Sequence, residues 1–248
     1  MRRLLSAALV LAVSAPLAAQ SSGDVAAYLA LASTPAGGVA PSLAAPLMMQ
    51  PASTRWRVQY GQIGDSDFRM RNIVGGVDVA AGPGVFGLTA GWDAPSCPAG
   101  SGCKGNFLAG VDWTTRLVGT PAPANAARFA LGLKASVGYA KPHGTDPLSG
   151  ADISLSTWSA SLGLPVAMTA SAGGVSISPF VTPGYGWGRV STSYSGSSTS
   201  ENGTRFLLGG GVQVGFRSGV ALMAGMQKVF ITGGKTAFGA GLSWQFGS

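Results

Sequence analysis

The stretch that decides the fold is Ala127-Arg-Phe-Ala-Leu-Gly-Leu-Lys-Ala-Ser-Val-Gly-Tyr-Ala-Lys141, in which apolar residues alternate with small or charged ones. Successive side chains of a β-strand point to opposite faces. One face would carry Phe129, Leu131, Leu133, Ala135, Val137 and Tyr139, and the other Arg128, Ala130, Gly132, Lys134, Ser136 and Gly138. Because a tilted strand crosses a bilayer in about 9 to 11 residues, this stretch predicts a membrane-spanning strand.

The composition favours a membrane β-protein over the other classes. Charged residues make up 10% of the 248 residues, and 39 positions are glycine, whereas about 25% of a typical soluble domain is charged. A helical membrane protein is excluded, because no apolar run of about 18 residues lies beyond the N-terminus. The formal charge of +7 is scattered along the chain, so we expect no binding to nucleic acid.

The N-terminus predicts export from the cytoplasm. Residues 1–20 combine the basic start Met1-Arg2-Arg3, an apolar run from Leu4 to Leu17, and a small-residue cleavage zone before Gln20. This order is typical of a secretory signal peptide. A signal anchor is the alternative, but the apolar run is short for one.

Residues 21–54 are rich in Ala, Pro and Ser and show no strand alternation. A short helix beginning after Asp24 is expected, and the prolines that follow, Pro35, Pro41, Pro46 and Pro51, would interrupt any further helix. We interpret the segment as a flexible periplasmic lead. The alternative is that part of it folds into the barrel as a plug.

Residues 55–248 repeat the alternating pattern about ten times, which predicts an all-β, transmembrane, antiparallel up-and-down β-barrel. A barrel of eight strands stays open if one weak hairpin is misread. Out-of-phase apolar residues in the first half of 152–164 predict a bulge near Thr157 or a register error. The expected strands are 55–63, 72–80, 85–92, 106–117, 127–141, 152–164, 175–190, 204–217, 220–230 and 235–246.

The connections and the aromatic residues agree with this topology. Outer-membrane barrels have short inner turns and longer outer loops, and we expect outer loops at 64–71, 93–104, 142–151 and 191–203, with inner turns at 81–84 and 218–219. The inner connections at 118–126 and 165–174 would be long. Outward aromatics form an inner set, Trp56, Phe129, Phe216, Trp244 and Phe246, and an outer set, Trp92, Phe107, Tyr139, Tyr185, Trp187, Phe206 and Phe238. Two such girdles are typical of membrane barrels.

With its signal peptide, alternation and aromatic ends, residues 55–248 resemble the small outer-membrane β-barrels of Gram-negative bacteria, the OmpA/OmpX-like group. The final strand, Ala237-Phe-Gly-Ala-Gly-Leu-Ser-Trp-Gln-Phe246, is similar to the terminal signal that the barrel assembly machinery reads, although Gly247 and Ser248 follow the aromatic residue. The resemblance implies that the protein lies in the outer membrane and contacts its lipid and lipopolysaccharide.

Five inward-facing charges and two cysteines are the candidate site residues. Cys97 and Cys103 are separated by five residues in an outer loop, and in an oxidising compartment we expect a disulfide rather than two free thiols. The topology would bring four arginines to the periplasmic mouth, where they would favour anions. The alternative is that they hydrate the barrel end or pair with Asp112. These arginines are Arg57, Arg116, Arg128 and Arg217.

The inward face is otherwise lined largely by glycine. Such a lining either closes a narrow barrel tightly or leaves a narrow passage. The glycines are Gly61, Gly76, Gly110, Gly132, Gly186, Gly209, Gly211, Gly225, Gly239 and Gly241.

Catalytic groups are scarce. A rim-located hydrolase would have to use His143 with Thr145 and Asp146, and a solvated loop histidine is the stronger interpretation. We expect no metal, no cofactor and no enzymatic activity. The leading hypothesis is a non-enzymatic outer-membrane barrel with a structural or surface role in the envelope, and the alternative is a narrow pore or small-ligand conduit with a slight anion preference.

Overall fold

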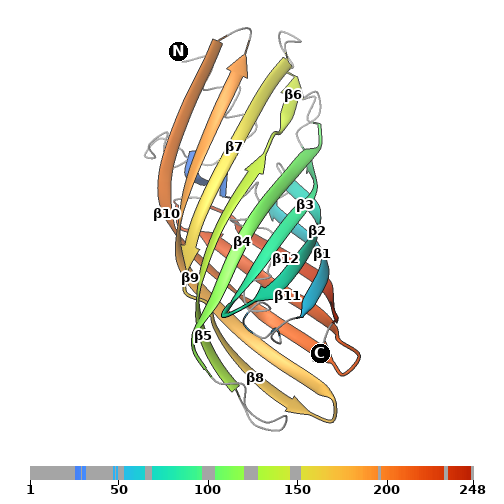
Figure 1. The fold of residues 1–248 in the computed structure, drawn as a ribbon. Coiled ribbons are helices and arrows are strands. Elements are labelled where there is room, and N and C mark those ends of the chain that lie inside the picture. The colour runs from blue at the N-terminus through green and yellow to red at the C-terminus, as the bar shows by residue number, and fades with distance from the viewer. Residues whose placement is uncertain are drawn as a thin grey trace.

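The structure is a computed structural model that describes residues 26–28, 30–31, 47, 49, 53–64, 69–96, 104–119, 128–145, 152–194, 197–231 and 234–246. Within these ranges twelve strands form one closed antiparallel barrel, because the last strand pairs with the first (Figure 1). The strands are β1 (Thr54–Gly64), β2 (Arg69–Ala81), β3 (Gly84–Ser96), β4 (Asn106–Val118), β5 (Arg128–Ala140), β6 (His143–Thr145), β7 (Asp152–Gly163), β8 (Val166–Ala172), β9 (Val175–Tyr194), β10 (Ser197–Phe216), β11 (Val220–Val229) and β12 (Thr236–Phe246).

These twelve strands make ten passes, so the described part of the chain forms a ten-stranded barrel rather than one of eight. β7 and β8 run one after the other between the same two neighbours, β5 and β9, and count as one pass. The short β6 follows β5 after two residues and pairs with β7. The predicted fold class, a transmembrane antiparallel barrel of about ten strands, is confirmed.

The predicted long inner connection at 165–174 is wrong. After Leu164 the strand is interrupted at Pro165, which has no backbone N–H to donate to a neighbouring strand. The chain then continues as β8 and turns at Gly173 and Gly174, whose φ angles are +59° and +86°. The pass therefore ends in a two-residue turn of the kind that membrane barrels have on the inner side.

The predicted outer loop at 191–203 is also wrong, because β9 and β10 continue through it. Their register runs without a break from the pair Val175 and Phe216 to the pair Tyr194 and Ser197. Each strand is 20 residues long, about twice what a bilayer requires. The apolar alternation stops where the strands leave the lipid, whereas the backbone ladder continues into water.

No bulge interrupts the register at Thr157. This residue pairs with Ala140 on one side and Val190 on the other, and the neighbouring pairs continue in step. The phase is constant because Leu155 faces inward and is buried, while Trp158 faces outward. An irregularity instead lies in β4, between Arg116 and Val118.

Two predicted inner turns are confirmed. β2 and β3 are joined at Gly82 and Pro83, and Gly82 has a φ of +58°. β10 and β11 are joined through Gly219, whose φ is +84° and whose N–H donates to the carbonyl of Phe216 over 3.0 Å. Glycine adopts these left-handed conformations without steric cost.

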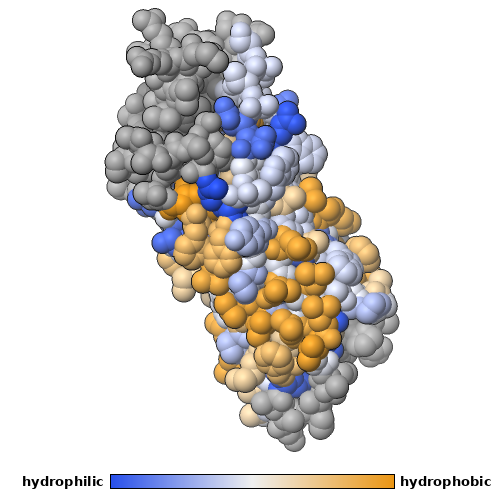
Figure 2. Space-filling view, turned by 90° about the vertical axis from the view of Figure 1, so that its left-hand side faces the viewer, coloured by the Kyte–Doolittle hydropathy of each residue, from blue (hydrophilic) through white to orange (hydrophobic). Residues whose placement is uncertain are grey.

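The two faces of the wall differ as the alternation predicts. In β1, the side chain of Trp56 is 58% exposed whereas that of Arg57, the next residue, is 5% exposed. Figure 2 shows hydrophobic residues in a broad band over the lower part of the visible face, with hydrophilic residues above it. No helix among the described residues has the length and apolarity needed to cross a bilayer.

Candidate functional site

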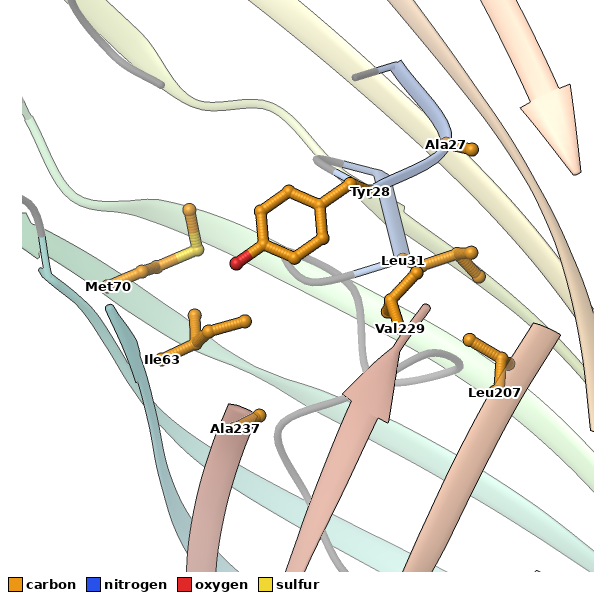
Figure 3. Close-up of a cluster of buried hydrophobic side chains, with 8 residues drawn as sticks. All are labelled: Ala27, Tyr28, Leu31, Ile63, Met70, Leu207, Val229 and Ala237. Carbon is orange, nitrogen blue, oxygen red and sulfur yellow. The ribbon is translucent and has the colours of Figure 1, made fainter. Parts of the chain in front are cut away.

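The outer half of the barrel lumen holds a helix from the N-terminal segment. We call its described residues, 26–28 and 30–31, the lumenal helix. The side chains of Ala27 and Leu31 are fully buried and Tyr28 is nearly so. They pack against inward-facing residues of β1, β2, β10, β11 and β12 (Figure 3), namely Ile63, Met70, Leu207, Val229 and Ala237.

One hydrogen bond fixes the polar end of this apolar contact. The backbone N–H of Lys235, next to the start of β12, donates to the hydroxyl of Tyr28 over 3.2 Å. A buried tyrosine hydroxyl usually needs such a partner. The lumenal helix is thus seated through both packing and a specific polar contact.

A second part of the N-terminal segment lies in the inner half of the lumen. Leu47 is buried and packs with Ala130, Ala167 and Phe180, which belong to β5, β8 and β9. The guanidinium of Arg116 donates to the carbonyl oxygen of Leu47. The described residues of the segment 21–54 thus lie against the inside of the barrel wall, where the alternative interpretation, a plug, would place them.

Inward glycines make room for this segment. A Cβ atom on Gly188 would lie 2.9 Å from the Cα of Ala27, and one on Gly186 would meet the side chain of Leu31. A Cβ atom on Gly132 would likewise meet the side chain of Leu47. Two of the glycines that we predicted to line the lumen, Gly132 and Gly186, are thus covered by the chain's own residues.

Five charged side chains, which we call the lumenal charge cluster, face the lumen in the inner half of the barrel. They are Arg55, Arg57, Asp78, Asp112 and Lys134. The Nε atom of Arg55 donates to Asp78 Oδ2 over 2.9 Å, and Arg57 contacts both carboxylates, Asp78 at 3.1 Å and Asp112 at 3.2 Å. All five side chains are at most 10% exposed.

Such a cluster is stable only as a set. Removing charges from water costs several kcal/mol per ion, and close partners offset that cost. Arg57 is the central member, because its Nη2 also donates to Thr89 Oγ1 over 2.8 Å. Side chains from five neighbouring strands, β1 to β5, are therefore linked on the lumenal face of the wall.

The structure separates the residues that the sequence analysis grouped at the periplasmic mouth. Arg57 and Asp112 form an ion pair. Arg116 contacts Leu47, whereas Arg128 is half-buried in β5 and Arg217 is exposed at an inner turn. A shared anion-attracting ring of the four arginines stays a prediction.

Arg55 is the functional residue that the sequence analysis missed, although a signal for it was present. It lies two positions before Arg57 and therefore on the same, inward face of β1. Lys134 was placed on the inner face, but its distance from Arg57 in sequence, 77 residues, hid the fact that both side chains approach Asp112. The ion pair of Arg57 and Asp78 joins two neighbouring strands, and predicting it would have required the register between β1 and β2.

The other candidate residues are less informative. Cys97 and Cys103 lie outside the described residues, so their disulfide stays a prediction. The Nδ1 atom of His143 is 2.8 Å from the carbonyl oxygen of Lys141, and the side chains of Thr145 and Asp146 are not among those described. Within the described ranges, no three His, Cys, Asp or Glu side chains are placed to share a metal ion.

No protein-family model matches the chain, and no curated protein matches it. Solved structures similar to it include the N-terminal β-barrel domain of Pseudomonas aeruginosa OprF, with 11% identity, coverage of 80% of this chain and 100% of that one, and a TM-score of 0.37. Yersinia pestis Ail, in complex with the heparin analogue sucrose octasulfate, is 13% identical, with 79% and 100% coverage and a TM-score of 0.42. The Escherichia coli outer-membrane protease OmpT is 9% identical, with 81% and 99% coverage and a TM-score of 0.42.

Likenesses at this level carry no inference about activity. The closed ladder of ten passes and the apolar outer wall are properties of this chain's own structure. On that ground, the chain folds as a closed antiparallel β-barrel of ten passes with an apolar outer wall.

Proposed function

We propose that this protein is a non-enzymatic outer-membrane barrel with a structural or surface role, and that its lumen is closed to solutes. The observation that carries the proposal is the occupied lumen. The lumenal helix lies in the outer half, and the lumenal charge cluster lies in the inner half. A protein built to conduct solutes would need both seals to open.

The energetics favour a closed state. Burial of a large apolar side chain contributes about 1.5–3 kcal/mol, and both Leu31 and Tyr28 are buried against the barrel wall. Opening the inner half would separate Arg57 from its two carboxylates and leave charges unpaired in the lumen, which costs about 3–5 kcal/mol for a buried pair. The two costs arise independently.

The location also supports an envelope role. The apolar outer wall is suited to contact with outer-membrane lipid and the outer leaflet's lipopolysaccharide. Export by the predicted signal peptide and insertion by the barrel assembly machinery belong to the same proposal. The polar continuation of β9 and β10 would then project from the membrane and supply the part of the protein that other molecules meet first.

Planar-bilayer conductance tests the closed lumen. The chain beginning at Ser21 is refolded, heat-modifiable migration confirms folding, and single channels are recorded beside a variant that lacks residues 21–52. Ser53 is kept because its carbonyl accepts the N–H of Ala80. We expect the longer chain to be silent. Steady openings from it, at all tested voltages, would contradict the proposal.

The alternative function, a narrow conduit with a slight anion preference, is favoured by the excess of cations in the charge cluster. The same recording separates it from a closed barrel. Openings of the longer chain that select anions, and lose this selectivity when Arg57 is replaced by Gln, would establish the conduit. Openings seen only after deletion of 21–52 would instead identify the lumenal helix as the main seal.

A further inference from the structure

A small cavity lies in the lumen beside the charge cluster. It has a volume of about 20 Å³ and is bounded by inward-facing residues of β5, β7, β9, β10 and β11, including Lys134, Ser161, Thr182, Leu207 and Gln227. A space of at least about 10–15 Å³ accommodates one water-sized occupant. The cavity therefore has room for one small species and excludes larger ones.

The charges around the cavity do not balance. The lumenal charge cluster contains three cations and two carboxylates. Arg57 contacts both carboxylates, and Asp78 is also bound by Arg55. Lys134 is the remaining cation, and its Nζ lies 3.9 Å from Asp112 Oδ1. One positive charge among these five described residues is thus left without a carboxylate of its own.

Lys134 also has donors to spare. An ammonium group carries three N–H donors, and 3.9 Å is longer than a hydrogen bond. No hydrogen bond from this ammonium occurs among the described contacts. Its side chain is only 7% exposed.

A second residue of the cavity, Thr182, has a hydroxyl group without a hydrogen-bond partner. Thr182 is 6% exposed, and its buried Oγ1 atom makes no hydrogen bond. A buried hydroxyl without a partner costs about 1–3 kcal/mol. Ser161, by contrast, is satisfied through its contact with Ser136 Oγ at 2.6 Å. Lys134 and Thr182, which both have a donor without a hydrogen bond, thus border the same cavity.

We propose that this cavity binds one small monovalent anion of chloride size, held by the ammonium of Lys134 and the hydroxyl of Thr182. Both groups donate hydrogen bonds, and an anion accepts them. Its charge would bring the lumenal charge cluster to neutrality, which a water molecule would not do. The inference is independent of the proposed structural role, because the site would exist in a closed barrel and in a conduit alike.

The lumenal helix covers this site toward the outer mouth. Leu207 lines the cavity and also packs in the same cluster as Leu31. The anion would therefore exchange slowly while the helix is seated. Removing residues 21–52 should leave the affinity for the anion largely intact and speed its exchange.

The test combines location with stability. Crystals of the refolded chain grown in bromide should show an anomalous peak within hydrogen-bond distance of Lys134 Nζ and Thr182 Oγ1. In detergent, the thermal midpoint of heat-modifiable migration should rise saturably with chloride or bromide. It should not rise with gluconate at equal ionic strength, because gluconate is too large for the cavity. A site filled by water alone, without an anomalous peak, would overturn the proposal.

Two variants and one control test whether Lys134 and Thr182 cause the halide response. Thr182→Val keeps the side-chain shape and removes one donor. It should raise the half-saturating halide concentration about tenfold. Lys134→Met should abolish the halide response. Lys228→Met, at an exposed lysine of β11, should leave it unchanged. If Lys134→Met does not fold, the Thr182→Val result and the bromide peak decide, and an unchanged halide response in Thr182→Val would contradict the assignment.

Discussion

The two halves of the lumen are closed by opposite chemistries. In the outer half the lumenal helix packs apolar side chains against the wall, and the hydroxyl of Tyr28 accepts one hydrogen bond from the wall. In the inner half the wall itself supplies the seal, through ion pairs between its own strands. From this comparison we expect that the outer seal can be removed without unfolding the barrel, whereas the inner seal contributes to the barrel's stability.

Breaking the inner seal should have the largest effect. Asp78→Asn removes the carboxylate that Arg55 and Arg57 share at full burial, and we expect the free energy of unfolding to fall by about 3–5 kcal/mol. Urea titration of the refolded barrel in micelles measures this loss. Glu201→Gln makes the same chemical change at an exposed position of β10, and equal effects of the two substitutions would contradict a structural role for the cluster.

Displacing the outer seal should leave the barrel folded. Gly188→Val introduces a Cβ atom 2.9 Å from the backbone of Ala27, and the helix must move to avoid it. We expect fast hydrogen exchange in the peptide that contains residues 26–31, with a change in barrel stability of less than about 1 kcal/mol.

The control for this displacement is Gly75→Val. Gly75 faces outward, and the nearest atom to its Cβ position is 4.0 Å away. Hydrogen exchange of the lumenal helix should be unchanged in this variant. Equal protection in the Gly188→Val and Gly75→Val proteins would show that the helix does not lie against β9.

A smaller effect is expected where the lead meets the wall near the inner mouth. Arg116→Met removes the donor to the Leu47 carbonyl but keeps an apolar stem, and hydrogen bonds from charged groups contribute about 1.5–3 kcal/mol. Because Arg116 is half-buried, we expect the low end of that range, seen as faster proteolysis of residues 32–52. In the control variant Arg217→Met, at an exposed turn, residues 32–52 should be cleaved at the rate of the unmodified protein.

The strand faces were predictable from sequence because a period of two needs no tertiary information. Trp56 and Arg57 fall on opposite faces for this reason, and Lys134 falls inside. The ends of strands were harder to predict. At Pro165 and beyond Val190 the apolar pattern fails, either because proline interrupts a pass or because the strand has left the lipid.

The position of the lumenal helix inside the barrel could not be predicted from the sequence pattern. Its sequence predicts a short helix after Asp24, but its site is built from residues of five strands that are distant in the chain. The sequence contains glycine at the alternate positions 186 and 188. Glycine, however, suits an open passage and a close helix contact equally well. Only the position of Leu31 and Ala27 distinguishes the two.

The most direct test of the occupied lumen is a measurement of contacts between the lumenal helix and the wall. Methyl-labelled protein beginning at Ser21, refolded in micelles, should show nuclear Overhauser effects between Leu31 and Leu207 and between the Tyr28 ring and Val229 or Ile63. These contacts define a seated helix. Absence of all of them, in a barrel whose strand contacts are intact, would contradict the seated helix and leave the outer half of the lumen open.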